Sequence, residues 1–237
     1  MARKRKKSGL PPGTLVYTGS VDSGETRIVT VDYGVESHQV TETIMPIAPN
    51  TGNSRWVSVT KINDIGVIKK LGQDYNIDDL YLEDILNTHQ RPKIEFSDNV
   101  IFVCLQHLYR GRETKALTSE QVSLILTPSG IISFEEQETP LFFNVRSRID
   151  KGERLLRSSR EDLLLYSLVD SIVDEYGELL TQIEVDIDEL EARIETYSPT
   201  GLHKDLYRLR LELQRIRRAA QPLRDSIRHL LDEQHAL

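Results

Sequence analysis

Carboxylates are the side chains in this sequence with the clearest capacity for chemistry. Glu83 and Asp84 are neighbours near the end of an expected short helix. Asp170 and Asp174 are four residues apart, so they share one face of an expected long helix. Like charges this close repel unless a cation or solvent separates them, and Mg²⁺ binds through one or two carboxylates while keeping several waters. The spacing alone leaves two interpretations open, a divalent-cation site or solvated surface charge.

No catalytic motif accompanies these acids. The sequence contains no G-x-S-x-G, no H-E-x-x-H and no glycine-rich loop of the phosphate-binding kind. Cys104 lies in an apolar run and is expected in the core rather than as a nucleophile. The six histidines show no ligand-like pairing, and we expect His89 and His107 to be structural. We therefore predict that the chain is not an enzyme.

Composition narrows the class of protein further. The chain has 237 residues, of which 38% are hydrophobic and 28% charged, so it can build a core. Its net charge of −7 argues against nucleic acid as a partner.

Five positive charges fall within residues 3–7, which leaves the rest of the chain at −12. We expect residues 1–8 to be a basic disordered tail, which is either solvated or in contact with an anionic membrane surface or nucleic acid. No apolar run is long enough to cross a bilayer, so a soluble chain is expected.

Residues 9–160 have the mixed pattern of a domain built from strands and helices. Short runs rich in β-branched and aromatic residues, bounded by turn-forming residues, predict strands. The strands are expected at residues 14–18, 26–31, 55–59, 99–108, 120–127 and 131–135, with the last two joined as a hairpin. The helices are expected at residues 65–75, 78–86 (with Asp78 as N-cap) and 140–156. This mixture predicts a sheet covered by helices.

Two long helices are expected after this domain, together forming a helical hairpin. Apolar side chains recur at spacings of three and four, which is the seam of helices that pack along their lengths, as in a coiled coil. The apolar positions are 165, 169, 172, 176, 179, 183, 187, 190, 194 and 197 in the first run, and 202, 206, 209, 213, 216, 220, 223, 227 and 230 in the second. Residues 161–199 are expected as an acidic long helix packed on the domain, and residues 200–237 as a basic second helix. Opposite charge favours their pairing, at about 0–1 kcal/mol for each exposed pair.

The second helix shows no stop signal. Its apolar pattern is still running at Leu230, and neither Gly nor Pro lies between there and Leu237. Pro222 lies inside the run, where it removes one helical hydrogen bond and is expected to bend the axis. We therefore expect residues 200–237 to be a helix that is cut short, in a chain that is a fragment of a longer protein.

Several ordered segments of this sequence resemble the CorA family of magnesium channels. They are Gly9–Gly19, Leu82–Asn87 followed by His89–Lys93, Glu120–Leu126, Leu165–Asp170 and Pro222–Arg224. The resemblance covers nearly the whole chain. One local departure is Gln221, where the family often has an aromatic residue before the proline.

The resemblance implies the N-terminal domain of a homopentameric channel, on the cytoplasmic side of the inner membrane. It implies an α+β fold in which a mixed β-sheet is sandwiched by helices (an αβα arrangement), followed by a long helical hairpin in which residues 200–237 begin a truncated stalk helix. The family's two transmembrane helices and Gly-Met-Asn motif are absent here, so the membrane would be reached through a missing C-terminal segment. It also implies that Mg²⁺, or Co²⁺, binds between subunits and favours the closed state. The motif places Asp84 as the principal ligand, with Glu83 and Asp170 contributing a second position. Asp174 is a weaker candidate, suggested by its spacing from Asp170.

Two alternatives remain open at the level of sequence. One is the equivalent domain of a zinc transporter from the same superfamily, although zinc prefers nitrogen and sulfur ligands. The other is a metal-independent helical scaffold that forms oligomers through its long helices.

Overall fold

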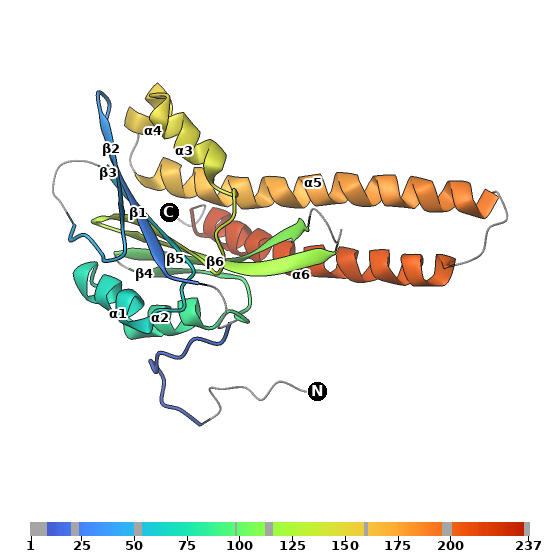
Figure 1. Ribbon diagram of the computed structural model, residues 1–237, viewed down its shortest axis with the longest axis horizontal. Helices are drawn as coiled ribbons and strands as arrows, with labels where there is room; N and C mark the ends of the chain where they lie inside the picture. Colours follow the sequence, from blue (N-terminus) through green and yellow to red (C-terminus); the bar gives the residue numbers. More distant parts are fainter. Residues whose placement is uncertain are drawn as a thin grey trace. The chain divides into compact units, whose positions relative to one another are not determined.

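The computed structural model describes residues 9–19, 24–49, 54–97, 99–111, 116–158, 161–195 and 201–234 (Figure 1). The basic tail expected at residues 1–8 lies outside these described residues. The chain divides into two compact units. The first takes in the described residues up to Leu105 and those from Glu120 to Val169, and the second takes in Gln106–Ser119 and the described residues from Asp170 onward. The domain boundaries expected from sequence at residues 160 and 199 stay predictions.

A mixed sheet of seven strands runs in the order β2-β1-β3-β7-β6-β5-β4. The strands are β1 Arg27–Tyr33, β2 His38–Thr43, β3 Ser54–Thr60, β4 Lys93–Ser97, β5 Val100–Arg110, β6 Leu117–Thr127 and β7 Gly130–Glu135. The central pair β3 and β7 is parallel, whereas β1 pairs with β2 and β3, β4 with β5, and β6 with β7 in antiparallel fashion. The expected hairpin of residues 120–135 is therefore confirmed, with Thr127 opposite Gly130 across its turn.

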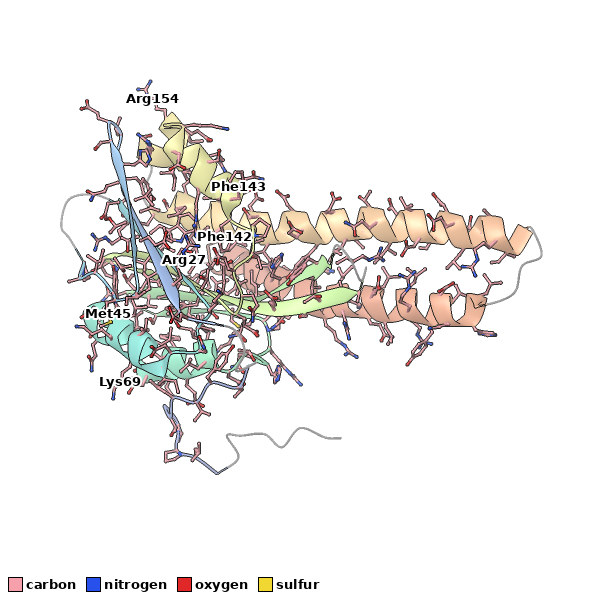
Figure 2. All side chains as sticks on the ribbon, in the orientation of Figure 1. Arg27, Met45, Lys69, Phe142, Phe143 and Arg154 are labelled. Carbon is pink, nitrogen blue, oxygen red and sulfur yellow. The ribbon has the colours of Figure 1, made fainter. Side chains whose placement is uncertain are left out.

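Helices cover both faces of this sheet in the first unit, so the predicted αβα arrangement is confirmed (Figure 1). α1 Ile65–Asp74 and α2 Asp79–Leu86 lie on one face, and α3 Phe143–Asp150 and α4 Arg154–Ser158 lie on the other. Successive side chains of β3 point to opposite faces of the sheet, and this explains why both faces carry apolar residues that helices cover. Val57 and Val59 enter the core beneath α1 and α2, whereas Trp56 contacts Phe142 just before α3, with ring centroids 6.0 Å apart (Figure 2).

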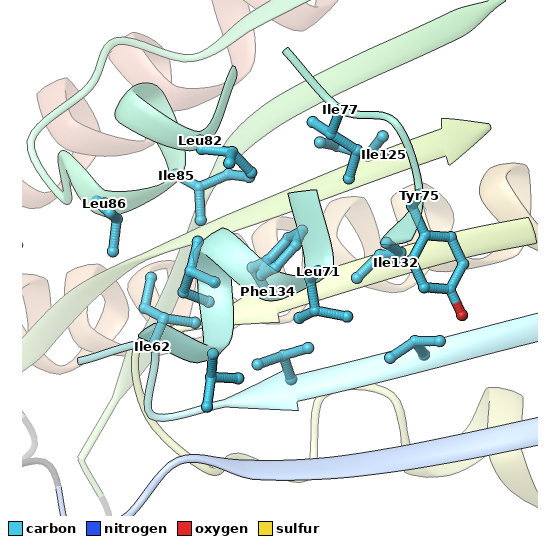
Figure 3. Close-up of a cluster of buried hydrophobic side chains, with 14 of the residues drawn as sticks. Ile62, Leu71, Tyr75, Ile77, Leu82, Ile85, Leu86, Ile125, Ile132 and Phe134 are labelled. Atoms are coloured by element: carbon cyan, nitrogen blue, oxygen red, sulfur yellow. The ribbon is translucent and has the colours of Figure 1, made fainter. Parts of the chain in front are cut away.

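The core beneath α1 and α2 is apolar and almost completely closed to solvent (Figure 3). The helices contribute Leu71, Leu82 and Ile85, and the sheet contributes residues such as Ile132 and Phe134. Each of these five side chains is buried. Burial on this scale contributes roughly 25 cal/mol for each Å² of apolar surface removed from water, so it holds both helices firmly against the sheet.

The two long helices expected from sequence are present as α5 Glu161–Glu195 and α6 Leu202–Gln234, and α6 continues through Pro222. In the second unit they run side by side in opposite directions (Figure 1). Asp186 on α5 forms an ion pair with Arg208 on α6 at 3.1 Å, as the charge pattern predicted. A second ion pair has the opposite sense, because it joins the base Arg193 on α5 to the acid Asp205 on α6 at 2.7 Å.

The expected seam is wrong at four of its positions. Buried side chains on the two helices include Tyr176, Leu179, Ile183 and Leu190 on α5, and Leu209, Ile216 and Leu223 on α6. In contrast, Ile187 and Ile194 on α5 and Leu206 and Leu213 on α6 are exposed. The seam expected from the three-and-four spacing therefore mixes two stripes of apolar residues on each helix. The chain buries one stripe and leaves the other exposed.

Three further expectations from sequence differ from the structure. Residues 14–18 form no strand, because Leu15 and Tyr17 pack on the core from an irregular segment. Strands β2 and β4 were not expected, because both are edge strands whose sparse burial gives little apolar pattern. The helix expected at 140–156 is split into α3 and α4, since Gly152 between them has a φ of 76°.

No helix among the described residues is long and apolar enough to span a membrane.

Candidate metal centre

Helix α2 carries Glu83 and Asp84, and its sequence explains how it is positioned. The Asp78 carboxylate caps its N-terminus by accepting a hydrogen bond from the Leu80 N–H at 2.8 Å, as predicted. Leu82, Ile85 and Leu86 are spaced three and four residues apart, so they share the face that is buried in the core. Glu83 and Asp84 fall between these apolar residues, at the edge of the buried face.

Two close contacts fix the position of α2. Gly72 on α1 faces Leu82, and a Cβ at residue 72 would lie 2.4 Å from a Leu82 methyl carbon, so the two helices approach closely only because residue 72 is glycine. On the other side, the buried Gln121 side chain donates from Nε2 to the backbone carbonyls of Asp84 at 2.9 Å and Ile85 at 3.2 Å. Gln121 thereby satisfies carbonyls in the last turn of α2, which a helix end leaves without internal partners.

The Asp84 carboxylate uses both oxygens within its own chain. Oδ1 accepts a hydrogen bond from Gln90 Nε2 at 2.7 Å, and Oδ2 lies 2.7 Å from the Lys93 ammonium. The Asp84 side chain is 20% exposed, so the carboxylate is held in place but is still in contact with solvent. Charge-assisted hydrogen bonds of this length are stronger than neutral ones.

Lys93 supplies the positive charge that pairs with the Asp84 carboxylate. Its ammonium also lies 2.8 Å from Glu95 and 5.4 Å from the centre of the Phe102 ring. Partial burial lowers the pKa of Lys93, but the hydrogen bonds and negative charge of Asp84 and Glu95 outweigh burial, so the net effect is a raised pKa. Lys93 is therefore charged at neutral pH and balances Asp84.

Glu83 is oriented by the N-terminal loop. Its Oε2 accepts a hydrogen bond from the Gly13 N–H at 2.6 Å, and Gly13 has a φ of +80°, a conformation that favours glycine. The same loop is tied to the end of α2, where the Thr18 N–H donates to the Leu86 carbonyl at 3.0 Å. The structure thus places Glu83 and Asp84 as neighbours with separate partners.

Asp170 and Asp174 lie one turn apart on α5, in the second unit. Asp170 is partly buried and Asp174 is exposed. Among the described residues, no group of three or more His, Cys, Asp or Glu side chains is arranged to hold a metal ion. The acids therefore form two pairs, one on α2 and one on α5.

Cys104 and His107, two other polar groups considered from sequence, are buried. Burial raises the pKa of Cys104 to about 12, so the thiol is not a nucleophile. Burial also lowers the pKa of His107 to about 4, which keeps that imidazole neutral, and His89 is exposed.

The partners of Asp84 were missed from sequence. Gln90 and Lys93 both lie in the segment His89–Lys93, which the sequence analysis used only for its resemblance to a family. A basic residue that follows an acidic helix end after a short proline-containing turn was the available signal. The hydrogen bonds of Gln121 could not be predicted from sequence, since a polar residue within a strand does not indicate which carbonyls its side chain contacts.

Comparison with known proteins decides the family. A family model described as "CorA-like Mg2+ transporter protein" matches residues 52–237, which is most of the chain. The chain belongs to the CorA family. A relative named "Cobalt/magnesium transport protein CorA" in Thermotoga maritima is 36% identical over 233 residues, covering 96% of this chain and 66% of the relative. The chain thus spans somewhat less than two thirds of that relative's length.

Solved CorA structures share the fold. The complete CorA magnesium transporter of Methanocaldococcus jannaschii matches with a TM-score of 0.70 at 15% identity, covering 86% of this chain and 62% of that one. The soluble domain of the same transporter matches with a TM-score of 0.66, covering 84% of this chain and 76% of that one. The predicted fold class is confirmed by this agreement.

Proposed function

We propose that this chain is the regulatory domain of a CorA-type divalent-cation channel, on the cytoplasmic side of the membrane, and that it binds Mg²⁺ or Co²⁺ between subunits to favour the closed state. The name of the Thermotoga relative supports the choice of these two ions for this chain. Membership of a transporter family also supports the prediction that the chain is not an enzyme.

One observation carries the proposal. Asp84 already holds a positively charged group, the Lys93 ammonium, 2.7 Å from Oδ2, at a carboxylate that remains partly open to solvent. A carboxylate that is rigidly held, partly desolvated and paired with a cation is suited to binding a second cation in exchange for the first. Glu83 lies beside it in sequence with its own anchoring hydrogen bond. Asp170 and Asp174 are proposed as further ligands on the resemblance alone.

The mechanism we propose is a switch with two states. Mg²⁺ between neighbouring subunits of a homopentamer neutralises the repulsion between their acidic bodies and holds the closed arrangement. When the Mg²⁺ concentration falls, the ions leave and the subunits move apart. A ligand shifts such an equilibrium only by its difference in affinity for the two states. The imported ion therefore limits its own entry.

The test uses a full-length channel carrying this domain, reconstituted in liposomes, with Mg²⁺ added on the side that the domain faces. We expect Mg²⁺ to suppress ion flux through the unmodified channel and to suppress it far less in Asp84→Ala. A variant in which Asp79, an exposed acid at the start of α2, is replaced by Ala is the matched control and should behave as the unmodified channel. Equal suppression of flux in the Asp84→Ala channel would remove Asp84 from the proposed sensor.

A titration distinguishes the proposed ions from zinc. Calorimetric titration of the chain with Mg²⁺, Co²⁺ and Zn²⁺ should give binding of Mg²⁺ and Co²⁺ that Asp84→Ala weakens. Oxygen ligands favour this order, because zinc prefers nitrogen and sulfur. Binding of zinc alone would replace the magnesium proposal with the zinc-transporter alternative.

A further inference from the structure

Helix α5 carries a second apolar stripe that the described residues of its own chain leave exposed. Val173, Leu180, Ile187 and Ile194 are seven residues apart in succession, and each is between 37% and 54% exposed. A repeat of seven keeps side chains on one side of a helix, with a slow drift of about 20° per repeat. The residues that α5 buries, such as Tyr176 and Ile183, lie at other positions of the repeat.

Helix α6 has a matching stripe. Leu206 and Leu213 are also seven residues apart and exposed, whereas Leu209 and Ile216 are buried. Each of the two long helices therefore uses one stripe for packing within the chain and presents another to solvent. Apolar side chains exposed at a regular repeat along both helices are what a helix seam awaiting a partner presents.

The charges that flank the two stripes have opposite signs. On α5, Glu184 and Glu191 follow Leu180 and Ile187 by four residues, so each acid shares the face of its apolar neighbour. On α6, Arg210 and Arg217 follow Leu206 and Leu213 by the same four residues.

These flanking charges are exposed and are separate from the ion pairs within the chain. The pairs that join α5 to α6 use Asp186 with Arg208 and Arg193 with Asp205. In the described part of the chain, no ion pair engages Glu184, Glu191, Arg210 or Arg217. Their charge is thus available to a partner.

We propose that the exposed stripe of α5 docks on the exposed stripe of α6 from a second copy of this chain. The α5 stripe is Val173, Leu180, Ile187 and Ile194, and the α6 stripe is Leu206 and Leu213. The two stripes share their apolar spacing and the position of their charges, and the charges are complementary in sign. Charges beside an apolar seam choose the partner helix, because like charges brought together oppose the pairing. Contact of α5 with another α5 would place acid against acid, so the α5–α6 pairing is favoured.

This contact has consequences for assembly that go beyond metal binding at Asp84. The two surfaces differ, so the interface can be heterologous, and a heterologous interface that repeats with a suitable rotation closes a ring. The docking surface needs no metal ion, which separates its test from that of the proposed function.

The test is sedimentation equilibrium of the full chain in EDTA. The first variant carries Glu184→Lys and Glu191→Lys, the second carries Arg210→Glu and Arg217→Glu, and the third carries all four changes. We expect the unmodified chain to self-associate, and each double variant to raise the dissociation constant by about tenfold or more, because two attractive contacts become repulsive. The fourfold variant restores complementarity and should recover the original constant to within about threefold.

A matched control carries Glu178→Lys and Glu189→Lys, which make the same change in charge on α5. These exposed acids lie two residues from Leu180 and Ile187, so they face away from the stripe. The control should associate nearly as the unmodified chain does. Circular dichroism melting shows whether each variant is folded, which is expected since every substituted side chain is exposed.

Three results would overturn the proposal: an unmodified chain that stays monomeric at high micromolar concentration, a fourfold variant that fails to recover, or a control that weakens association as much as the first variant. A further variant, Leu180→Gln with Ile187→Gln, tests the apolar part and should weaken association without altering its salt dependence.

Discussion

Lys93 and Asp84 form an ion pair in which Nζ lies 2.7 Å from Oδ2, at the end of a helix that also carries Glu83. The lysine belongs to β4, an edge strand, and its ammonium lies over the Phe102 ring, 5.4 Å from the ring centre. Asp84 is thus neutralised by a cation that is tethered to the same fold. Under the proposed function, a metal ion that binds Asp84 would compete with this ammonium, so we expect Lys93 to raise the concentration of Mg²⁺ needed for exchange.

Replacement of Lys93 by Met should strengthen Mg²⁺ binding. Removing the competing charge leaves Asp84 without a counter-ion. Metal binding then no longer has to offset the free energy of the contact between Lys93 and Asp84. For a partly exposed pair we expect the dissociation constant for Mg²⁺ to fall roughly two- to fivefold, equivalent to about 0.5–1 kcal/mol. Calorimetric titration of the chain measures this constant directly.

Lys69→Met is the control for that prediction, because Lys69 is an exposed lysine on α1 (Figure 2) and the change in net charge is the same. It should leave the dissociation constant almost unaltered. Weaker Mg²⁺ binding in Lys93→Met would show instead that the lysine positions Asp84 for the metal.

Arg110 should be a major determinant of stability in the second unit. Its guanidinium Nη2 lies 2.8 Å from Asp186 on α5 and 2.6 Å from Glu212 on α6, and the Arg110 and Glu212 side chains are 9% and 6% exposed. Arg110→Met leaves Glu212 buried without its cation. Breaking a buried pair in this way costs about 3–5 kcal/mol, which urea unfolding should detect.

The exposed Arg218 on α6 provides the comparison. Arg218→Met should change the free energy of unfolding by less than about 0.5 kcal/mol. If both variants lost the same stability, the network around Arg110 would have no special role.

Glu135 should make the protein less stable as pH rises. Burial raises the pKa of Glu135 to about 8, although the nearby Arg146 guanidinium and a hydrogen bond from Thr139 at 3.3 Å act in the opposite direction. From about pH 4.5 to 8 the unfolded chain has lost this proton and the folded chain retains it. The free energy of unfolding therefore falls over that window, by up to ~1.4 kcal/mol per pH unit from this group.

Urea unfolding at intervals across that window measures the slope. Glu135→Gln should flatten it, whereas Glu36→Gln, at an exposed acid, should not. Burial also raises the pKa of Glu136 to about 7, so part of the slope should remain in the Glu135 variant. A Glu135→Gln chain with an undiminished slope would contradict the assignment.

Two glycine substitutions should have opposite effects on stability. At Gly130, which has a φ of +126°, an added Cβ would lie 2.5 Å from the Arg55 carbonyl oxygen, so Gly130→Ala should destabilise the fold by about 1–3 kcal/mol. At Gly177, within α5, an added Cβ meets no atom within 4 Å. Gly177→Ala should stabilise by about 0.5–1 kcal/mol through helix propensity. Thermal unfolding of both variants checks the signs, and the same sign for both would be evidence against this account.

Much of the fold could be predicted because burial leaves a repeating apolar pattern. The largely buried strands β3, β5 and β7 were predicted, since each combines β-branched residues with flanking turns. The edge strands β2 and β4 were missed because they bury too little to show a pattern. The two stripes of α5 and α6 share a repeat of seven residues, so spacing alone could not separate buried Leu209 from exposed Leu213.

The candidate site could be predicted only in part. Residue type and spacing indicated Glu83 and Asp84 as possible ligands. Their partners Gly13 and Lys93 come from segments distant along the chain or across a turn, and a single sequence does not show which such segments meet. The carboxylate of Asp84 could thus be foreseen, whereas the ammonium that neutralises it required the structure.

The most direct test of the central claim is calorimetric titration of the chain with Mg²⁺, comparing Asp84→Asn with Asp79→Asn. Both variants lose one negative charge from α2, and only Asp84 is held by Gln90 and Lys93. We predict that Asp84→Asn weakens Mg²⁺ binding by about tenfold or more, which is ~1.4 kcal/mol, and that Asp79→Asn leaves it nearly unchanged. Binding of Mg²⁺ by Asp84→Asn with the affinity of the unmodified chain would contradict the account.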